Sequence, residues 1–89
     1  MKVAIYGQDN EQVQKCREYA KQNNYEVSNE FIDDADTGNK SFEQMIEAAS
    51  EFDGVVIQNR EKLAKDAAER EMKLKALRQS GLETVFVNP

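Results

Sequence analysis

The sequence contains no histidine and no tryptophan, and it has one cysteine and one proline among 89 residues. Without histidine, Ser41, which lies near a loop at a predicted helix start, has no ordinary general base to activate it. The lone Cys16 cannot form a disulfide within the chain. Its place among apolar residues at helical spacing predicts a buried thiol in a reducing compartment. We therefore expect a cytoplasmic protein that is not a serine hydrolase.

Long apolar runs are also absent. None approaches the roughly 18 residues needed to cross a bilayer, and Met1-Lys2 leads directly into a short apolar segment rather than a signal peptide, so no membrane association is expected. Acidic residues outnumber basic ones by 17 to 12, which gives a formal net charge of −5. Because nucleic-acid binding depends on Lys and Arg that neutralise phosphates, residues 1–89, taken as a single small domain, are expected to bind DNA weakly.

Four short apolar segments predict strands, at residues 3–6, 25–32, 55–57 and 84–87. Three of them are apolar, or nearly so, along their whole length, which is typical of strands covered by helices on both faces. The segment 25–32 is more mixed and predicts an edge strand. Its apolar residues share one face and its polar residues the other, namely Tyr25, Val27 and Phe31 against Glu26, Ser28 and Glu30.

Helical patterns fill the three intervals between the strands. The first helix is expected to begin at Asp9 or Asn10, to bury Val13, Cys16 and Ala20, and to end at Asn23-Asn24. The second is expected to open with a capping box formed by Ser41 and Gln44 and to turn a stripe inward. That stripe comprises Phe42, Met45, Ile46 and Ala49.

The third helix is predicted to run without interruption over residues 60–79. Four apolar residues should face inward, namely Leu63, Ala67, Leu74 and Leu77. Its outer face should carry ion pairs at i, i+4 in contact with solvent. The expected pairs are Asp66–Arg70, Glu69–Lys73 and Glu71–Lys75.

This order of elements predicts a three-layer αβα fold with a four-stranded parallel sheet, strand order 2-1-3-4, of the flavodoxin-like doubly wound class. Ligands of such sheets bind beyond the carboxyl ends of the strands. The polar residues expected there are Gln8, Asp9, Asn10, Asp33, Asp34, Asp36, Gln58, Asn59, Arg60, Glu61, Lys62 and Lys65.

Three familiar types of site are disfavoured at this edge. The four aspartates at 9, 33, 34 and 36 have the oxygen chemistry of a Mg²⁺ site, but a D-D-x-D sequence is more typical of turns. A phosphoacceptor aspartate would end the third strand, where Gln58-Asn59 stands. A glycine-rich nucleotide loop is missing because Gly7 is alone. We therefore predict neither a metal nor a cofactor.

Several short motifs occur in one order along the chain. They comprise Val3-Ala4-Ile5-Tyr6, residues 17–20 (REYA), 24–27 (NYEV), 31–38 (FIDDADTG), 40–42 (KSF), 54–57 (GVVI), 61–65 (EKLAK) and 81–87 (GLETVFV). In this order and spacing they resemble the catalytic domain of the serine recombinases, the resolvase and invertase family. The resemblance implies a resolvase-like fold over most of the chain.

The same resemblance implies that the catalytic residues have been replaced. In the family a serine hydroxyl attacks a DNA phosphodiester while arginines hold the phosphate oxygens. Here the serine position is Asn10, whose amide cannot act as that nucleophile, and the arginine position two residues earlier is Gln8. The degenerate family positions are Tyr6, Gln8, Asn10, Asp33, Lys40, Glu61, Lys62 and Lys65. We expect no catalytic residue and no strand cleavage.

Two functions from different classes follow. The first is an inactive recombinase-like domain of a phage, plasmid or mobile element that modulates recombination through a protein partner or a homo-oligomer. The second is a flavodoxin-like domain that binds a phosphate-bearing ligand or nucleotide through Gln8, Asn10, Lys62 and Lys65. Family members continue into a dimerisation helix and a basic DNA-binding module, which residues 1–89 are expected to lack, either as a piece of a longer protein or as a naturally short one. In a short protein, the strand at 84–87 would offer an open edge to a partner.

Overall fold

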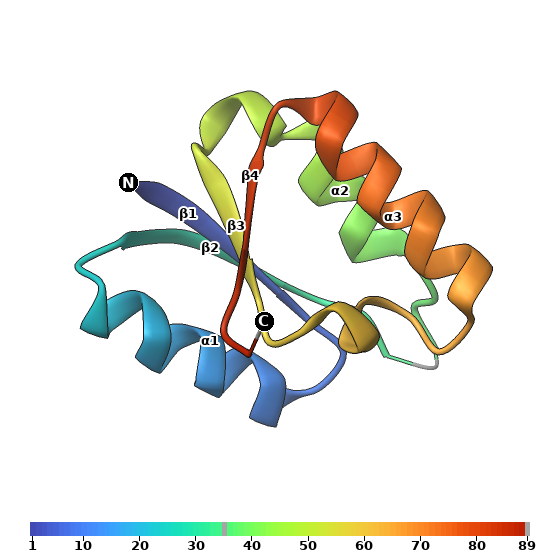
Figure 1. The fold of residues 1–89 in the computed structure, drawn as a ribbon, viewed down its shortest axis with the longest axis horizontal. Coiled ribbons are helices and arrows are strands. Elements are labelled where there is room, and N and C mark those ends of the chain that lie inside the picture. Colours follow the sequence, from blue (N-terminus) through green and yellow to red (C-terminus); the bar gives the residue numbers. More distant parts are fainter. Residues whose placement is uncertain (35, 89) are drawn as a thin grey trace.

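The computed structural model describes residues 1–34 and 36–88, and it contains one parallel sheet with helices on both faces (Figure 1). Ala35, which falls inside the 31–38 motif, and Pro89 lie outside the described residues. The elements in chain order are β1 (Lys2–Gly7), α1 (Asn10–Gln22), β2 (Glu26–Ile32), α2 (Lys40–Glu47), the 3₁₀ turn η1 (Ala49–Glu51), β3 (Gly54–Ile57), the 3₁₀ turn η2 (Arg60–Leu63), α3 (Ala67–Ser80) and β4 (Glu83–Phe86).

The four strands are parallel and lie in the order β2-β1-β3-β4, which confirms the predicted topology. Figure 1 shows α1 on one side of the sheet and both α2 and α3 on the other. Two separate apolar clusters result because alternate residues of a strand point to opposite faces. Along β1, Val3 and Ile5 pack with α1, whereas Ala4 and Tyr6 pack with α2 and α3.

The first helix follows its prediction closely. Asp9 is its N-cap and accepts a hydrogen bond from the Gln12 N–H at 2.8 Å. The expected apolar residues Val13, Cys16 and Ala20 are fully buried against the sheet. Asn24, just beyond the helix, adopts a φ of 59°, the left-handed conformation that asparagine tolerates well.

The edge strand β2 is confirmed, but the prediction that Phe31 shares a face with Tyr25 and Val27 is wrong. Val27 pairs with Val3 while Asn29 pairs with Ala4, so Ser28 is an extra residue in the strand. Because side chains alternate with a period of two, one inserted residue transfers every later side chain to the opposite face. Tyr25 and Val27 therefore pack on the α1 side, and Phe31 packs on the side of α2 and α3.

The prediction of one continuous third helix is also wrong. Asn59 caps η2 by accepting the Lys62 N–H at 3.0 Å, and Asp66 caps α3 by accepting the Ala68 N–H at 2.8 Å. Two caps within eight residues divide the segment, because each side chain satisfies N–H groups that a continuous helix would use itself. Ala67, expected inside, is exposed at the start of α3, whereas Leu63, Leu74 and Leu77 are buried as predicted.

The predicted ion pairs along α3 do not form within the described part of the chain, where salt bridges join Glu11 to Lys15 and Arg17 to Glu30 instead. Lys73, expected on the solvent face, is buried. The capping box at α2 is wrong as well, because the N-cap is Asn39 and the Ser41 hydroxyl donates to the Ile32 carbonyl at 2.7 Å. None of the helices in residues 1–34 and 36–88 has the length and apolar character to cross a membrane.

Candidate functional site

A cleft of about 600 Å³ lies at the carboxyl ends of the strands, between the segments that follow β1, β2 and β3. It is the location that an open parallel sheet provides for a ligand. Its lining residues are Gln8, Asp9, Gln12, Asp33, Asp34, Gly38, Asn39, Glu61, Lys62, Lys65 and Glu69.

The structure brings together five of the eight family positions and leaves three outside the cleft. Asn10, at the serine position, and Lys40, at the arginine position, are exposed and do not line the cleft. Tyr6 is fully buried beneath it. The five lining residues are Gln8, Asp33, Glu61, Lys62 and Lys65.

Asp33 is the most heavily hydrogen-bonded of these residues. One carboxylate oxygen accepts from the Ser41 N–H at 2.7 Å and from the Thr37 hydroxyl at 3.1 Å. The other accepts from the Phe42 N–H at 2.9 Å and from the Tyr6 hydroxyl at 2.8 Å. Asp33 therefore caps the first turn of α2 from the end of β2, and it has no free oxygen to offer a ligand.

Lys73, on α3, is the third member of this buried polar group, and the sequence pattern does not predict its burial. Its ammonium donates to the Tyr6 hydroxyl at 3.0 Å and to the Leu63 carbonyl at 2.7 Å, and it lies 5.2 Å from the centre of the Phe42 ring. The sequence holds only part of the signal, because position 73 stands one turn before Leu77 on the inward stripe and also one turn after Glu69. The nearby Glu69 made a solvent-exposed pair look preferable.

The pKa values follow from this arrangement. Burial alone would raise the pKa of Asp33, but the N–H groups of Ser41 and Phe42, with the Tyr6 and Thr37 hydroxyls, hold it below its ordinary value. Burial lowers the pKa of Lys73, opposed by the carboxylates of Asp33 and Glu69. Burial and the Asp33 carboxylate together raise the pKa of Tyr6 far above its usual range. Asp33 is therefore an ionised structural acceptor, and Tyr6 is a neutral donor.

Gln8 uses its polar groups for hydrogen bonds within the protein rather than presenting them to a ligand. Its side-chain amide donates to the Leu63 carbonyl at 3.0 Å, and its backbone N–H donates to the Gln12 side chain at 3.0 Å. Leu63 is the last residue of η2, and its carbonyl accepts hydrogen bonds from both the Gln8 side chain and the Lys73 ammonium. The segment that carries Lys62 and Lys65 is thus joined at one carbonyl oxygen to the residue that follows β1 and to α3.

The cleft has no free hydroxyl within the described residues. The Thr37 hydroxyl donates to Asp33 and accepts from the Asp34 N–H at 2.9 Å, the Ser41 hydroxyl is bonded to Ile32, and Tyr6 is buried. Carboxylates also dominate the charge of the lining, with five acids against two lysines. The acids are Asp9, Asp33, Asp34, Glu61 and Glu69. A phosphate-bearing ligand is not favoured in such surroundings.

The predicted turn chemistry of the aspartates is also visible. Asp34 accepts the N–H groups of Asp36 and Thr37 at 2.8 and 3.0 Å through one oxygen, as an Asx turn does. Within residues 1–34 and 36–88, no group of three or more His, Cys, Asp or Glu side chains is arranged to hold a metal ion.

Comparisons with known proteins agree with the geometry. The family model described as "Resolvase, N terminal domain" matches residues 3–89. Among solved structures, the chain is similar to the C-terminal catalytic domain of ISC1926 TnpA, an IS607-like serine recombinase. The TM-score is 0.75 and the sequence identity 18%, over 100% of this chain and 71% of that one. No curated protein sequence matches the chain. The structural likeness confirms the predicted fold class.

Proposed function

Because the chain belongs to the resolvase family, as a serine recombinase N-terminal domain, we propose that it is a catalytically inactive member that acts through contacts with other proteins. One observation carries this proposal. The cleft that should hold the scissile phosphate has no free hydroxyl in its described lining, and its carboxylates outnumber its ammonium groups.

Phosphodiester cleavage would place growing negative charge on phosphate oxygens inside this cleft. Four carboxylates besides Asp33 would repel that charge, and Lys62 and Lys65 are point charges that cannot grip a phosphate in bidentate fashion. Loss of a single preorganised donor costs roughly 10²–10³ in rate, and here the arginine forks and the nucleophile are both replaced. A carboxamide at Asn10 cannot attack phosphorus, and the residue is exposed and does not line the cleft.

The role that fits this chemistry is modulation of recombination in a phage, plasmid or mobile element, within the cytoplasm. A formal net charge of −5 disfavours DNA as the direct partner of these residues, so the contact that matters is with protein, either another polypeptide or a homo-oligomer.

A fusion experiment tests inactivity without depending on DNA affinity. The chain is joined to a sequence-specific DNA-binding domain and incubated with supercoiled plasmid that carries the matching sites. A catalytic serine recombinase domain in the same fusion is the control. We expect the control to form a covalent protein–DNA adduct that survives denaturing electrophoresis, and this chain to form none. An adduct with this chain would refute the proposal.

A further inference from the structure

A second hollow lies beside the cleft, between α2 and α3. Its apolar lining comes from Phe42 and Ile46 on α2 and from Met72 and Ala76 on α3, in two adjoining cavities of about 180 and 300 Å³. Met72 is 71% exposed, the higher value of the two large apolar side chains that are exposed in the described chain. We call this hollow the α2/α3 groove.

The rim of the α2/α3 groove is acidic. Glu43 and Glu47 on α2 and Glu69 on α3 border it, and none of the three forms a salt bridge within the described residues. The groove has one lysine in its lining, Lys73, whose ammonium is turned into the core toward Tyr6 and Leu63, so only its aliphatic stem reaches the groove.

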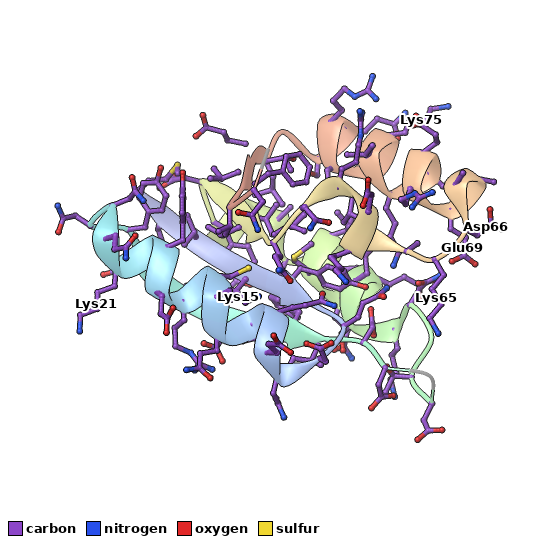
Figure 2. The ribbon with its side chains drawn as sticks, turned by 60° about the horizontal axis from the view of Figure 1, so that its bottom comes forward. Lys15, Lys21, Lys65, Asp66, Glu69 and Lys75 are labelled. Carbon is purple, nitrogen blue, oxygen red and sulfur yellow. The ribbon has the colours of Figure 1, made fainter. Side chains whose placement is uncertain are left out.

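The groove is also continuous with the cleft, because Asn39 and Glu69 line both. Figure 2 shows Glu69 near Asp66 and Lys65 at the N-terminal end of α3, the end that faces the cleft. A partner seated between α2 and α3 would therefore cover the edge of the degenerate site as well.

From this combination we infer that the α2/α3 groove binds an amphipathic helix of a partner protein, with apolar side chains on one face and Lys or Arg beside them. A groove between two helices accepts apolar side chains spaced at i, i+3 or i+4, and i+7, and the three glutamates select positive charge at its borders. The inference rests on the proposed function, in which this domain acts through protein contacts, and it specifies the chemistry of the partner.

Charge also decides between possible occupants. A two-fold contact centred on the groove would bring the three glutamates of both copies into one interface, and the chain has a formal net charge of −5. The phosphates of a nucleic acid would meet the same repulsion. A basic helix replaces this repulsion with attraction on both sides of the groove.

The test is selection from a displayed library of helical peptides of about 15 residues, with the intact chain as target. We expect the enriched peptides to combine an apolar stripe with Lys or Arg. When they are added to isotope-labelled protein, amide NMR shifts should concentrate in α2 and α3. Failure to enrich any peptide, enrichment of peptides without basic residues, or shifts that map elsewhere would overturn the inference.

Charge reversal provides the matched control. Glu43→Lys with Glu47→Lys should weaken peptide binding by about tenfold, whereas Glu18→Lys with Glu26→Lys, the same change of charge on exposed positions elsewhere, should change it by less than about twofold. Equal effects of the two pairs would refute a specific groove. A concentration-dependent dimer that Met72→Glu dissociates would show a second copy as the occupant, and would also refute it. Failure of the inactivity proposal is seen separately, as a covalent DNA adduct.

Discussion

The two faces of the sheet are stabilised in different ways. On the α1 face, the buried cluster is wholly apolar, with Val3, Ile5 and Val56 of the strands against Val13 and Cys16 of the helix. On the other face, an apolar cluster surrounds a polar group made of Tyr6, Asp33 and Lys73. The first face is held mainly by apolar burial, with a surface ion pair between Arg17 of α1 and Glu30 of β2. The second face also depends on buried hydrogen bonds between fixed atoms.

The two faces therefore contribute differently to the fold: one adds stability, and the other also fixes the positions of particular groups. Apolar packing is tolerant of small shifts, but a carboxylate that accepts four hydrogen bonds fixes the relative positions of the groups around it. Asp33 joins β2 to the start of α2, and Lys73 joins α3 to the end of η2. The polar group therefore fixes the relative positions of α2, η2 and α3, which border the cleft and the α2/α3 groove. The helix α1 stabilises the opposite face of the sheet.

The largest expected effect comes from removing the centre of the polar group. Asp33→Ala leaves the Tyr6 hydroxyl and two N–H groups of α2 without their acceptor, and it removes one of the two carboxylates that favour the charged form of Lys73, the other being Glu69. The free energy of unfolding should fall by about 3–5 kcal/mol. Chemical denaturation measures it. The control Asp36→Ala changes an exposed side chain nearby and should stay within about 0.5 kcal/mol of the parent. Equal losses for both would show that Asp33 is not the centre.

Lys73→Met should cost less, about 1–3 kcal/mol, because methionine keeps most of the buried volume while the bonds to Tyr6 and Leu63 are lost. The effect should be local. Hydrogen exchange should accelerate at amides around η2 and the start of α2, with the interior of α1 unchanged after correction for global stability. Uniform acceleration across both faces would contradict the separation of the two regions.

The sequence predicted the α1 face better than the polar face, and for a physical reason. The helical spacing of Val13, Cys16 and Ala20 reports burial directly, because apolar side chains have one favourable environment. A lysine such as Lys73 has two favourable environments. It can form an exposed ion pair with Glu69, or it can be buried with hydrogen bonds to residues far away in the chain, and local spacing does not distinguish the two. Likewise the bulge at Ser28 and the break between η2 and α3 depend on pairing and capping groups whose geometry is set by the folded chain.

The candidate site was likewise predicted in part. Motif order placed Gln8, Asp33, Glu61, Lys62 and Lys65 at one sheet edge, where the structure has them. It also grouped Asn10 and Lys40 with them, although both are exposed outside the cleft. A motif records neighbours along the chain, whereas the direction of a side chain at a helix start depends on which residue forms the cap.

Acid should weaken the polar face most, because Glu30, whose pKa the Arg17 guanidinium also holds below its ordinary value, lies at the surface of the α1 side. The folded-state pKa of Asp33 lies below its ordinary value, so its contribution to stability is fully present above about pH 3.9 and is lost as the pH falls through the lower, folded pKa. Denaturation midpoints measured from pH 6 downward should therefore drop in acid, and Asp33→Asn should flatten that part of the profile. Val13→Ala, on the α1 face, should lower stability by a similar amount at every pH. If the denaturation midpoint of Asp33→Asn fell with pH as steeply as that of the parent, the acid sensitivity would belong to other carboxylates.

The smallest effect is expected at the position that first suggested lost chemistry. Asn10→Ser restores the family's residue type, but the side chain is exposed at the first residue of α1 and does not line the cleft. Stability should change by less than about 0.5 kcal/mol, and no covalent adduct should form in the fusion assay. Gln8→Arg added to Asn10→Ser should not restore cleavage either, since Gln8 tethers Leu63 and the glutamates of the cleft remain. An adduct with Asn10→Ser alone would show that one hydroxyl suffices here, and that the acidic lining is no obstacle to a phosphate.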